Sequence, residues 1–121
     1  MNIIISKLKN IKSLDNLNLL YFEEVKVLIL QMNLDIKINQ KAKLYIKPTK
    51  LFLSKEKCEF ENRLKVNIKN ITKGEILASI ICEYKNFEIE VIMLKECINF
   101  ENEAYLYFKA SDISIVEVIN D

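Results

Sequence analysis

Two strands and a polar junction are encoded in the stretch Ala42-Lys43-Leu44-Tyr45-Ile46-Lys47-Pro48-Thr49-Lys50-Leu51-Phe52-Leu53. The pattern returns 62 residues later as Ala104-Tyr105-Leu106-Tyr107-Phe108-Lys109-Ala110-Ser111-Asp112-Ile113-Ser114-Ile115. In both copies an alternation of apolar and polar residues ends at a Lys, a hydroxyl residue follows two positions later, and a second alternation begins. Alternation is typical of strands, because successive side chains point to opposite faces of a sheet. Pro48 lacks an N–H, so it fits the junction rather than a paired strand.

The rest of the chain repeats in the same order, which indicates an internal duplication. Lys69-Asn70-Ile71 repeats Lys9-Asn10-Ile11 at an offset of 60 residues. Each copy of about sixty residues has the pattern strand, hairpin, short helix or loop, strand, strand. The charge-dense stretch from Lys55 to Glu61 has the character of a linker. We therefore expect a first repeat over residues 1–57 and a second over residues 58–121.

The alternating and apolar runs predict an all-β fold. Single strands are expected at residues 2–11, 17–22, 25–30, 62–71, 76–83 and 87–93, and strand pairs at 42–54 and 104–118. An exposed hairpin turn is expected at Glu23-Glu24. Residues 31–40 alternate like a strand, whereas their counterpart at 93–98 is more typical of a short helix, so both interpretations stay open. Five short strands and a brief helical piece fit a small OB-type barrel. The expected architecture is two tandem OB-like five-stranded barrels, each with a short helical segment.

Composition narrows the classes of function. Acidic and basic residues nearly cancel, at a net charge of +1 in 121 residues, which argues against nucleic-acid binding and against a polybasic membrane-surface protein. No apolar run approaches the length of a membrane span, and no signal peptide is recognisable. Cys58, Cys82 and Cys97 lack metal-ligand spacing, so we expect free thiols in a reducing cytosol.

An enzyme is the least expected class. The chain has no His, no pairing of a nucleophile with a base, and no Gly-rich loop of the kind that holds phosphates. We expect a non-enzymatic protein without a metal or organic cofactor.

Several of these segments together resemble a known family of oxyanion-binding modules. They are Asn62-x-Leu64-Lys65, the turn centred on Gly74, the segment Ile92–Phe100 and, most closely, Phe108-Lys109-Ala110-Ser111-Asp112-Ile113. The chain resembles the molybdate- and tungstate-binding TOBE family, also called Mop, in its tandem form. The resemblance implies OB-like barrels that bind molybdate or tungstate at subunit or module interfaces in the cytoplasm, in storage, transport or homeostasis. It also implies a homo-oligomer, a dimer or trimer, and a component of a molybdate transporter or regulator as a further partner.

The chemistry of the oxyanion selects the candidate residues. Molybdate and tungstate are tetrahedral dianions whose oxygens only accept hydrogen bonds, so their site must consist of donors. Both repeats keep an Asn, a Lys and a hydroxyl residue two positions after the Lys. The second repeat can add backbone N–H groups at Ala110 and Ser111. Arg63 stands next to the position where the family has its Arg, so it is a further candidate donor. The expected oxyanion-binding residues are Lys109, Ser111, Ala110, Asn62, Arg63, Lys47, Thr49 and Asn2. Because Pro48 removes one N–H, we expect the first site to be the weaker.

An alternative stays open because carboxylates stand where the family has donors. Glu59 and Glu61 replace two of them, and Glu96 replaces a hydroxyl. A carboxylate facing a dianion weakens binding by like-charge repulsion. The alternative is a module with a decayed anion site that acts as a structural or protein-interaction partner of a molybdate transporter or regulator. On a purely structural interpretation, Lys47 and Lys109 are solvated strand ends.

Overall fold

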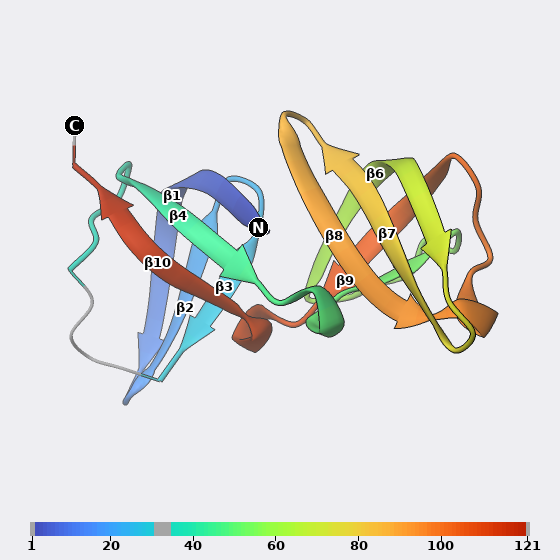
Figure 1. Ribbon diagram of the computed structural model, residues 1–121. Coiled ribbons are helices and arrows are strands. Elements are labelled where there is room, and N and C mark those ends of the chain that lie inside the picture. The colour runs from blue at the N-terminus through green and yellow to red at the C-terminus, as the bar shows by residue number, and fades with distance from the viewer. Residues whose placement is uncertain (1, 31–34, 121) are drawn as a thin grey trace.

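The computed structural model describes residues 2–30 and 35–120. Over these residues the chain forms strands and three 3-10 turns, arranged as two curled five-stranded sheets side by side (Figure 1). The strands are β1 (Ile3–Leu14), β2 (Leu17–Phe22), β3 (Lys26–Ile29), β4 (Lys41–Ile46), β5 (Phe52–Ser54), β6 (Asn62–Lys73), β7 (Leu77–Tyr84), β8 (Phe87–Leu94), β9 (Glu103–Phe108) and β10 (Ile113–Ile119). The turns are η1 (Pro48–Lys50), η2 (Lys95–Cys97) and η3 (Ala110–Asp112). This arrangement confirms the expected all-β fold of two small OB-like barrels.

The short helical segment expected in each repeat is present in the second. There, η2 lies within the stretch 93–98 that favoured a helix. Its counterpart in the first repeat includes residues 31–34, which lie outside the described residues. For residues 31–40 a strand and a short helix were both open, and residues 35–40 form neither. None of the helical turns in the described residues has the length and apolar character needed to cross a membrane.

The two long strands, β1 and β6, each contain an irregularity at the same place. In β1 the register with β2 shifts by one residue between Leu8 and Asn10. In β6 the register with β7 shifts between Ile68 and Asn70. A bulge of this kind bends a strand, so that its first half pairs with one neighbour and its second half with another. This bend lets a five-stranded sheet curl into a barrel.

One hydrophobic core runs through both barrels. The inward-facing residues of all the sheets belong to a single cluster, in which Leu8, Leu44, Ile80 and Leu106 are fully buried. Burying an aliphatic side chain of this size stabilises the fold by about 1.5–3 kcal/mol. The two repeats therefore pack against each other and share one core, rather than forming two independent domains.

The barrels exchange their last strands. In the first sheet the order is β10-β4-β1-β2-β3, and Ile113 of β10 pairs with Ile46 of β4. In the second sheet the order is β5-β9-β6-β7-β8, and Phe52 of β5 pairs with Tyr107 of β9. The exchange is visible in Figure 1, where the red β10 lies among the blue and cyan strands. Each sheet thus takes one strand from across the expected repeat boundary after residue 57, and the boundary itself stays a prediction.

Candidate functional site

The two junctions predicted from the repeated stretch have the same backbone geometry. Lys47 precedes η1 with φ −66° and ψ 138°, and Lys109 precedes η3 with φ −78° and ψ 147°. Each turn closes with a backbone hydrogen bond of 3.0 Å: the Lys50 N–H donates to the Lys47 carbonyl, and the Asp112 N–H donates to the Lys109 carbonyl. The duplicated sequence therefore folds into a duplicated local structure.

The side-chain donors of both junctions face solvent. Lys47, Thr49, Lys109 and Ser111 are exposed. Within the described part of the chain, none of these four side chains has a hydrogen bond or an ion pair. They are available to a ligand from solution.

Each junction lies on the boundary between the two barrels. At these points the chain crosses from one sheet to the other, from β4 to β5 through η1 and from β9 to β10 through η3 (Figure 1). The turn η1 packs against β8, and η3 packs against β3. The candidate donors of one repeat therefore lie beside an edge strand of the other.

The two repeated asparagines join the repeats through their side-chain amides. The Asn62 Nδ2 donates to the Lys26 carbonyl at 2.9 Å, and its Oδ1 accepts from the Lys26 N–H at 2.7 Å. Asn2 binds Glu90 in the same way, at 2.7 Å and 2.8 Å. Both asparagines are buried. The structure thus commits the oxygen and one N–H of each amide to the backbone of the opposite repeat, and a role in anion binding stays a prediction.

One of the donors expected to bind the oxyanion at the second junction is already hydrogen-bonded to a carboxylate of the protein. The Ala110 N–H donates to Glu61 Oε1 at 2.8 Å. Ala110 is buried, whereas Glu61 is exposed. An oxygen of the protein's own carboxylate therefore lies where the sequence predicted an oxygen of the oxyanion.

The remaining predicted residues are spread around this junction. Arg63 donates from Nη1 to the Cys58 carbonyl at 3.0 Å, and its guanidinium lies 5.9 Å from the centre of the Tyr105 ring. Arg63 is thus engaged with the linker and with β9. Glu96, by contrast, lines a different cleft, beside Ile76.

A cleft beside Asn62 is lined by four carboxylates. It has a volume of about 330 Å³ and lies between the β2–β3 turn and the segment 59–63. Its charged lining residues are Glu23, Glu24, Lys26, Glu59, Glu61 and Arg63. Glu23 is paired with Lys9 and Glu24 with Lys85, so Glu59 and Glu61 are the lining carboxylates without an ion pair among the described residues, and their charges oppose a dianion.

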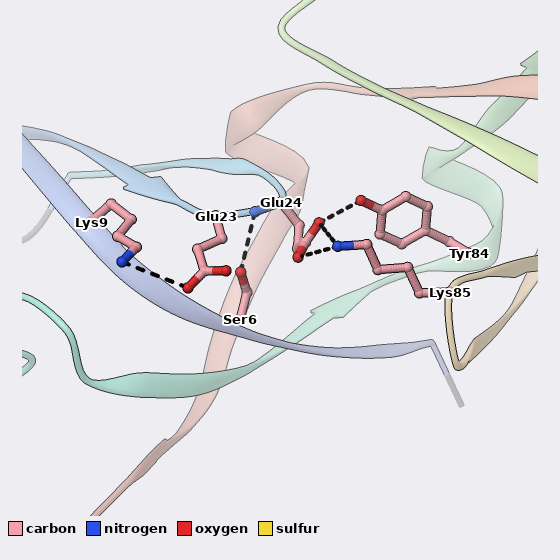
Figure 2. Close-up of polar contacts among 6 residues, drawn as sticks. All are labelled: Ser6, Lys9, Glu23, Glu24, Tyr84 and Lys85. Carbon is pink, nitrogen blue, oxygen red and sulfur yellow. Dashed lines mark hydrogen bonds and ion pairs between the residues drawn. The ribbon is translucent and has the colours of Figure 1, made fainter.

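A polar clamp, Glu24 with Tyr84 and Lys85, connects the β2–β3 turn to the β7–β8 turn (Figure 2). The Tyr84 hydroxyl donates to Glu24 Oε2, and the Lys85 ammonium lies 2.9 Å from Oε1 and 3.1 Å from Oε2. The Ser6 hydroxyl supports the turn by accepting from the Glu24 N–H at 3.3 Å. The Glu24 side chain is only 14 % exposed, so the expectation of a wholly exposed Glu23-Glu24 turn is wrong for Glu24.

The clamp changes the protonation equilibria of its members. Burial alone would raise the pKa of Glu24, but the hydrogen bonds from Tyr84 and Lys85 and the charge of Lys85 outweigh it and lower this pKa below its ordinary value. Burial and the bond to Glu24 raise the pKa of Tyr84. No feature of the sequence predicted this clamp, because its two turns are about sixty residues apart in a chain rich in Glu and Lys.

The cysteines differ in their surroundings. All three are free, and Cys58 and Cys97 are exposed, whereas Cys82 is buried. Burial raises the pKa of Cys82 to about 12. Among the described residues there is no group of three or more His, Cys, Asp or Glu placed to hold a metal ion.

Comparison with known proteins finds a likeness in structure only. No family model and no curated protein matches the sequence. A solved structure of the cytoplasmic molybdate-binding protein ModG, with molybdate bound, superposes with a TM-score of 0.81 over 94% of each chain. The chain has the ModG fold. Because only 14% of the aligned residues are identical, the likeness to ModG establishes the fold of both barrels and leaves the ligand to be argued from the site.

Proposed function

We propose that this protein binds a tetrahedral oxyanion, molybdate or tungstate, without catalysing a reaction. One observation carries the proposal: two junctions with the same Lys-x-Thr/Ser sequence and the same backbone geometry lie at the boundary between two barrels of the ModG fold. ModG is a molybdate-binding protein, and its crystal contains molybdate. The physiological role that follows is storage, transport or homeostasis of the oxyanion in the cytoplasm.

The side chains at each junction suit such a ligand. Lys47 and Thr49 in the first repeat, and Lys109 and Ser111 in the second, are exposed donors with no partner among the described residues. A hydrogen bond from such a donor to a charged oxygen contributes about 1.5–3 kcal/mol. Two donors on one turn give a weak site, which further donors must complete.

Assembly of several copies is part of the proposal. The family resemblance implies a dimer or trimer, and a second copy would bring additional donors to the junctions. Large apolar side chains at the hairpin ends support association, since Leu14 is 73% exposed and Ile76 is 70% exposed. A component of a molybdate transporter or regulator is the proposed further partner.

Calorimetric titration of the purified protein with molybdate and tungstate tests the binding. We expect saturable heat in the wild type and a binding constant at least about tenfold weaker in the Lys47→Gln, Lys109→Gln double variant. The matched control is Lys69→Gln, which removes an exposed lysine from β6, away from both junctions. An absence of heat and of any thermal shift at millimolar oxyanion would contradict oxyanion binding.

A second function is favoured by the carboxylates. Glu61 occupies the Ala110 N–H, and the neighbouring cleft holds four glutamates. These features support a module that has the fold without a working anion site and acts as a structural or interaction partner of a molybdate transporter or regulator. Reconstitution with a purified transporter or regulator component, followed by metal analysis of the complex, tests this function. A stable complex free of molybdenum and tungsten supports it, and an oxyanion retained in the complex contradicts it.

A further inference from the structure

We propose that the carboxylate of Glu61 is an internal competitor that weakens the binding of external oxyanions at the second-repeat junction by occupying its Ala110 N–H. This inference rests on the proposed function, because it assigns to one residue the control of that same site. It makes the two junctions inequivalent: the side-chain donors of both face solvent, but at the second junction the Ala110 N–H is already occupied by Glu61.

The fold holds Glu61 in position. The ladder between β6 and β9 pairs Asn62 with Phe108, so Glu61 comes next to Lys109 at the end of the ladder. Asn62 is fixed further by its two hydrogen bonds to the backbone of Lys26. From this anchored position the Glu61 carboxylate reaches the Ala110 N–H at 2.8 Å, between the two donor residues Lys109 and Ser111.

Two physical effects make this carboxylate an effective competitor. First, a group tethered beside its target has a high effective concentration, at least of the order of millimolar, which an oxyanion at trace concentration does not reach. Second, a displaced carboxylate stays close to the bound dianion and repels it. Glu61 is exposed, so it can move aside without opening the core.

The first junction has no such competitor in the described residues. In the first junction, Pro48 stands at the position that Ala110 has in the second, and it has no N–H that a carboxylate could occupy. Lys47 and Thr49 have no side-chain partner among residues 2–30 and 35–120. The missing N–H of Pro48, taken alone, predicts that the first site is the weaker. The contact of Glu61 reverses that order for the wild-type chain.

Nuclear magnetic resonance of the full chain tests the proposal at the Ala110 amide, with Glu61→Ala and a matched control, Glu59→Ala. Glu59 is exposed and lines the same cleft, but it makes no hydrogen bond to Ala110. Without oxyanion, we expect the Ala110 amide proton of Glu61→Ala to move upfield and exchange faster, and that of Glu59→Ala to stay as in the wild type. On titration with molybdate, the Ala110 resonance should respond at about tenfold lower concentration in Glu61→Ala than in the other two proteins.

The outcomes separate this inference from the proposed function. If Glu59→Ala gains as much affinity as Glu61→Ala, general charge repulsion governs the site and the competitor is refuted while oxyanion binding stands. If wild type and Glu61→Ala bind molybdate equally well, the competitor is again refuted. If no resonance of either protein responds to molybdate, the proposed oxyanion binding is refuted, and the role of Glu61 as a competitor is refuted as well. Only the selective gain in Glu61→Ala, together with the changed Ala110 amide, supports the inference.

Discussion

The buried amide of Asn62 is a structural contact between the repeats, whatever else it binds. Its two hydrogen bonds to Lys26 resemble one step of a β-ladder made by a side chain. We predict that Asn62→Ala lowers the free energy of unfolding by about 2 kcal/mol, since each hydrogen bond contributes about 1 kcal/mol. Urea denaturation measures the change. The exposed Asn70→Ala serves as the control and should cost less than about 0.5 kcal/mol. Equal losses in the two variants would contradict the structural role.

At the same scale, the sequence predicted candidate donors at the two junctions, but it did not predict what these residues contact. Asn2 and Asn62 were predicted as oxyanion donors because both repeats keep them, and both are buried. An amide, however, serves an anion or a peptide group equally well, and composition does not tell which one is near. The partner of Glu61, Ala110, is 49 residues away in the chain, so only the fold brings the two together.

Among the elements, the clamp between the β2–β3 turn and the β7–β8 turn makes stability depend on pH. The pKa of Glu24 is lowered in the folded protein from an ordinary value of 4.5. The folded state therefore favours the ionised form, and its stabilisation is complete above pH 4.5 and is lost as the pH falls through the lowered pKa. We predict that Glu24→Gln lowers the free energy of unfolding by about 1 kcal/mol at neutral pH.

Stability curves of the wild type and Glu24→Gln as a function of pH check this prediction. The two curves should differ at neutral pH and converge in acid. Glu23→Gln is a matched control one residue away, because the one ion pair of the Glu23 side chain among the described residues is an exposed pair of 3.8 Å with Lys9. Its curve should stay close to that of the wild type. Curves for Glu24→Gln and wild type that stay parallel into acid would refute the role of the ionised carboxylate.

The sequence predicted the elements well but not all of their neighbours. Alternation located the strand at 17–22 with the bounds of β2, whereas β6 runs two residues beyond the predicted 62–71. Alternation fixes which face of a strand is buried, but it carries no information about the adjacent strand. This is why the pairing of β5 with β9, and of β10 with β4, could not be predicted from the repeated stretch.

For the whole molecule, the exchange of strands links the stability of the two barrels. β10 completes the sheet of β1–β4 but is tethered through η3 to β9 in the other sheet. The same holds for β5, which follows η1 and β4. If an exchanged strand detaches from its sheet, the strand of the other sheet to which it is joined through a 3-10 turn is disturbed as well. In addition, the buried residues of both barrels form one continuous cluster. The chain should therefore unfold as one cooperative unit, as small single domains do.

A core substitution in one barrel tests this coupling. Leu44 lies in β4 and is fully buried, and Leu44→Ala should cost about 2–5 kcal/mol by leaving a cavity. We predict that amide resonances from both sheets report the same lowered midpoint in urea, although Leu44 belongs to the first sheet. Leu106→Ala in β9 is the reciprocal variant and should lower the midpoint of the first sheet as well. If resonances of β7 and β8 keep the wild-type midpoint in Leu44→Ala, the barrels unfold independently, and the exchanged strands connect them without coupling their stability.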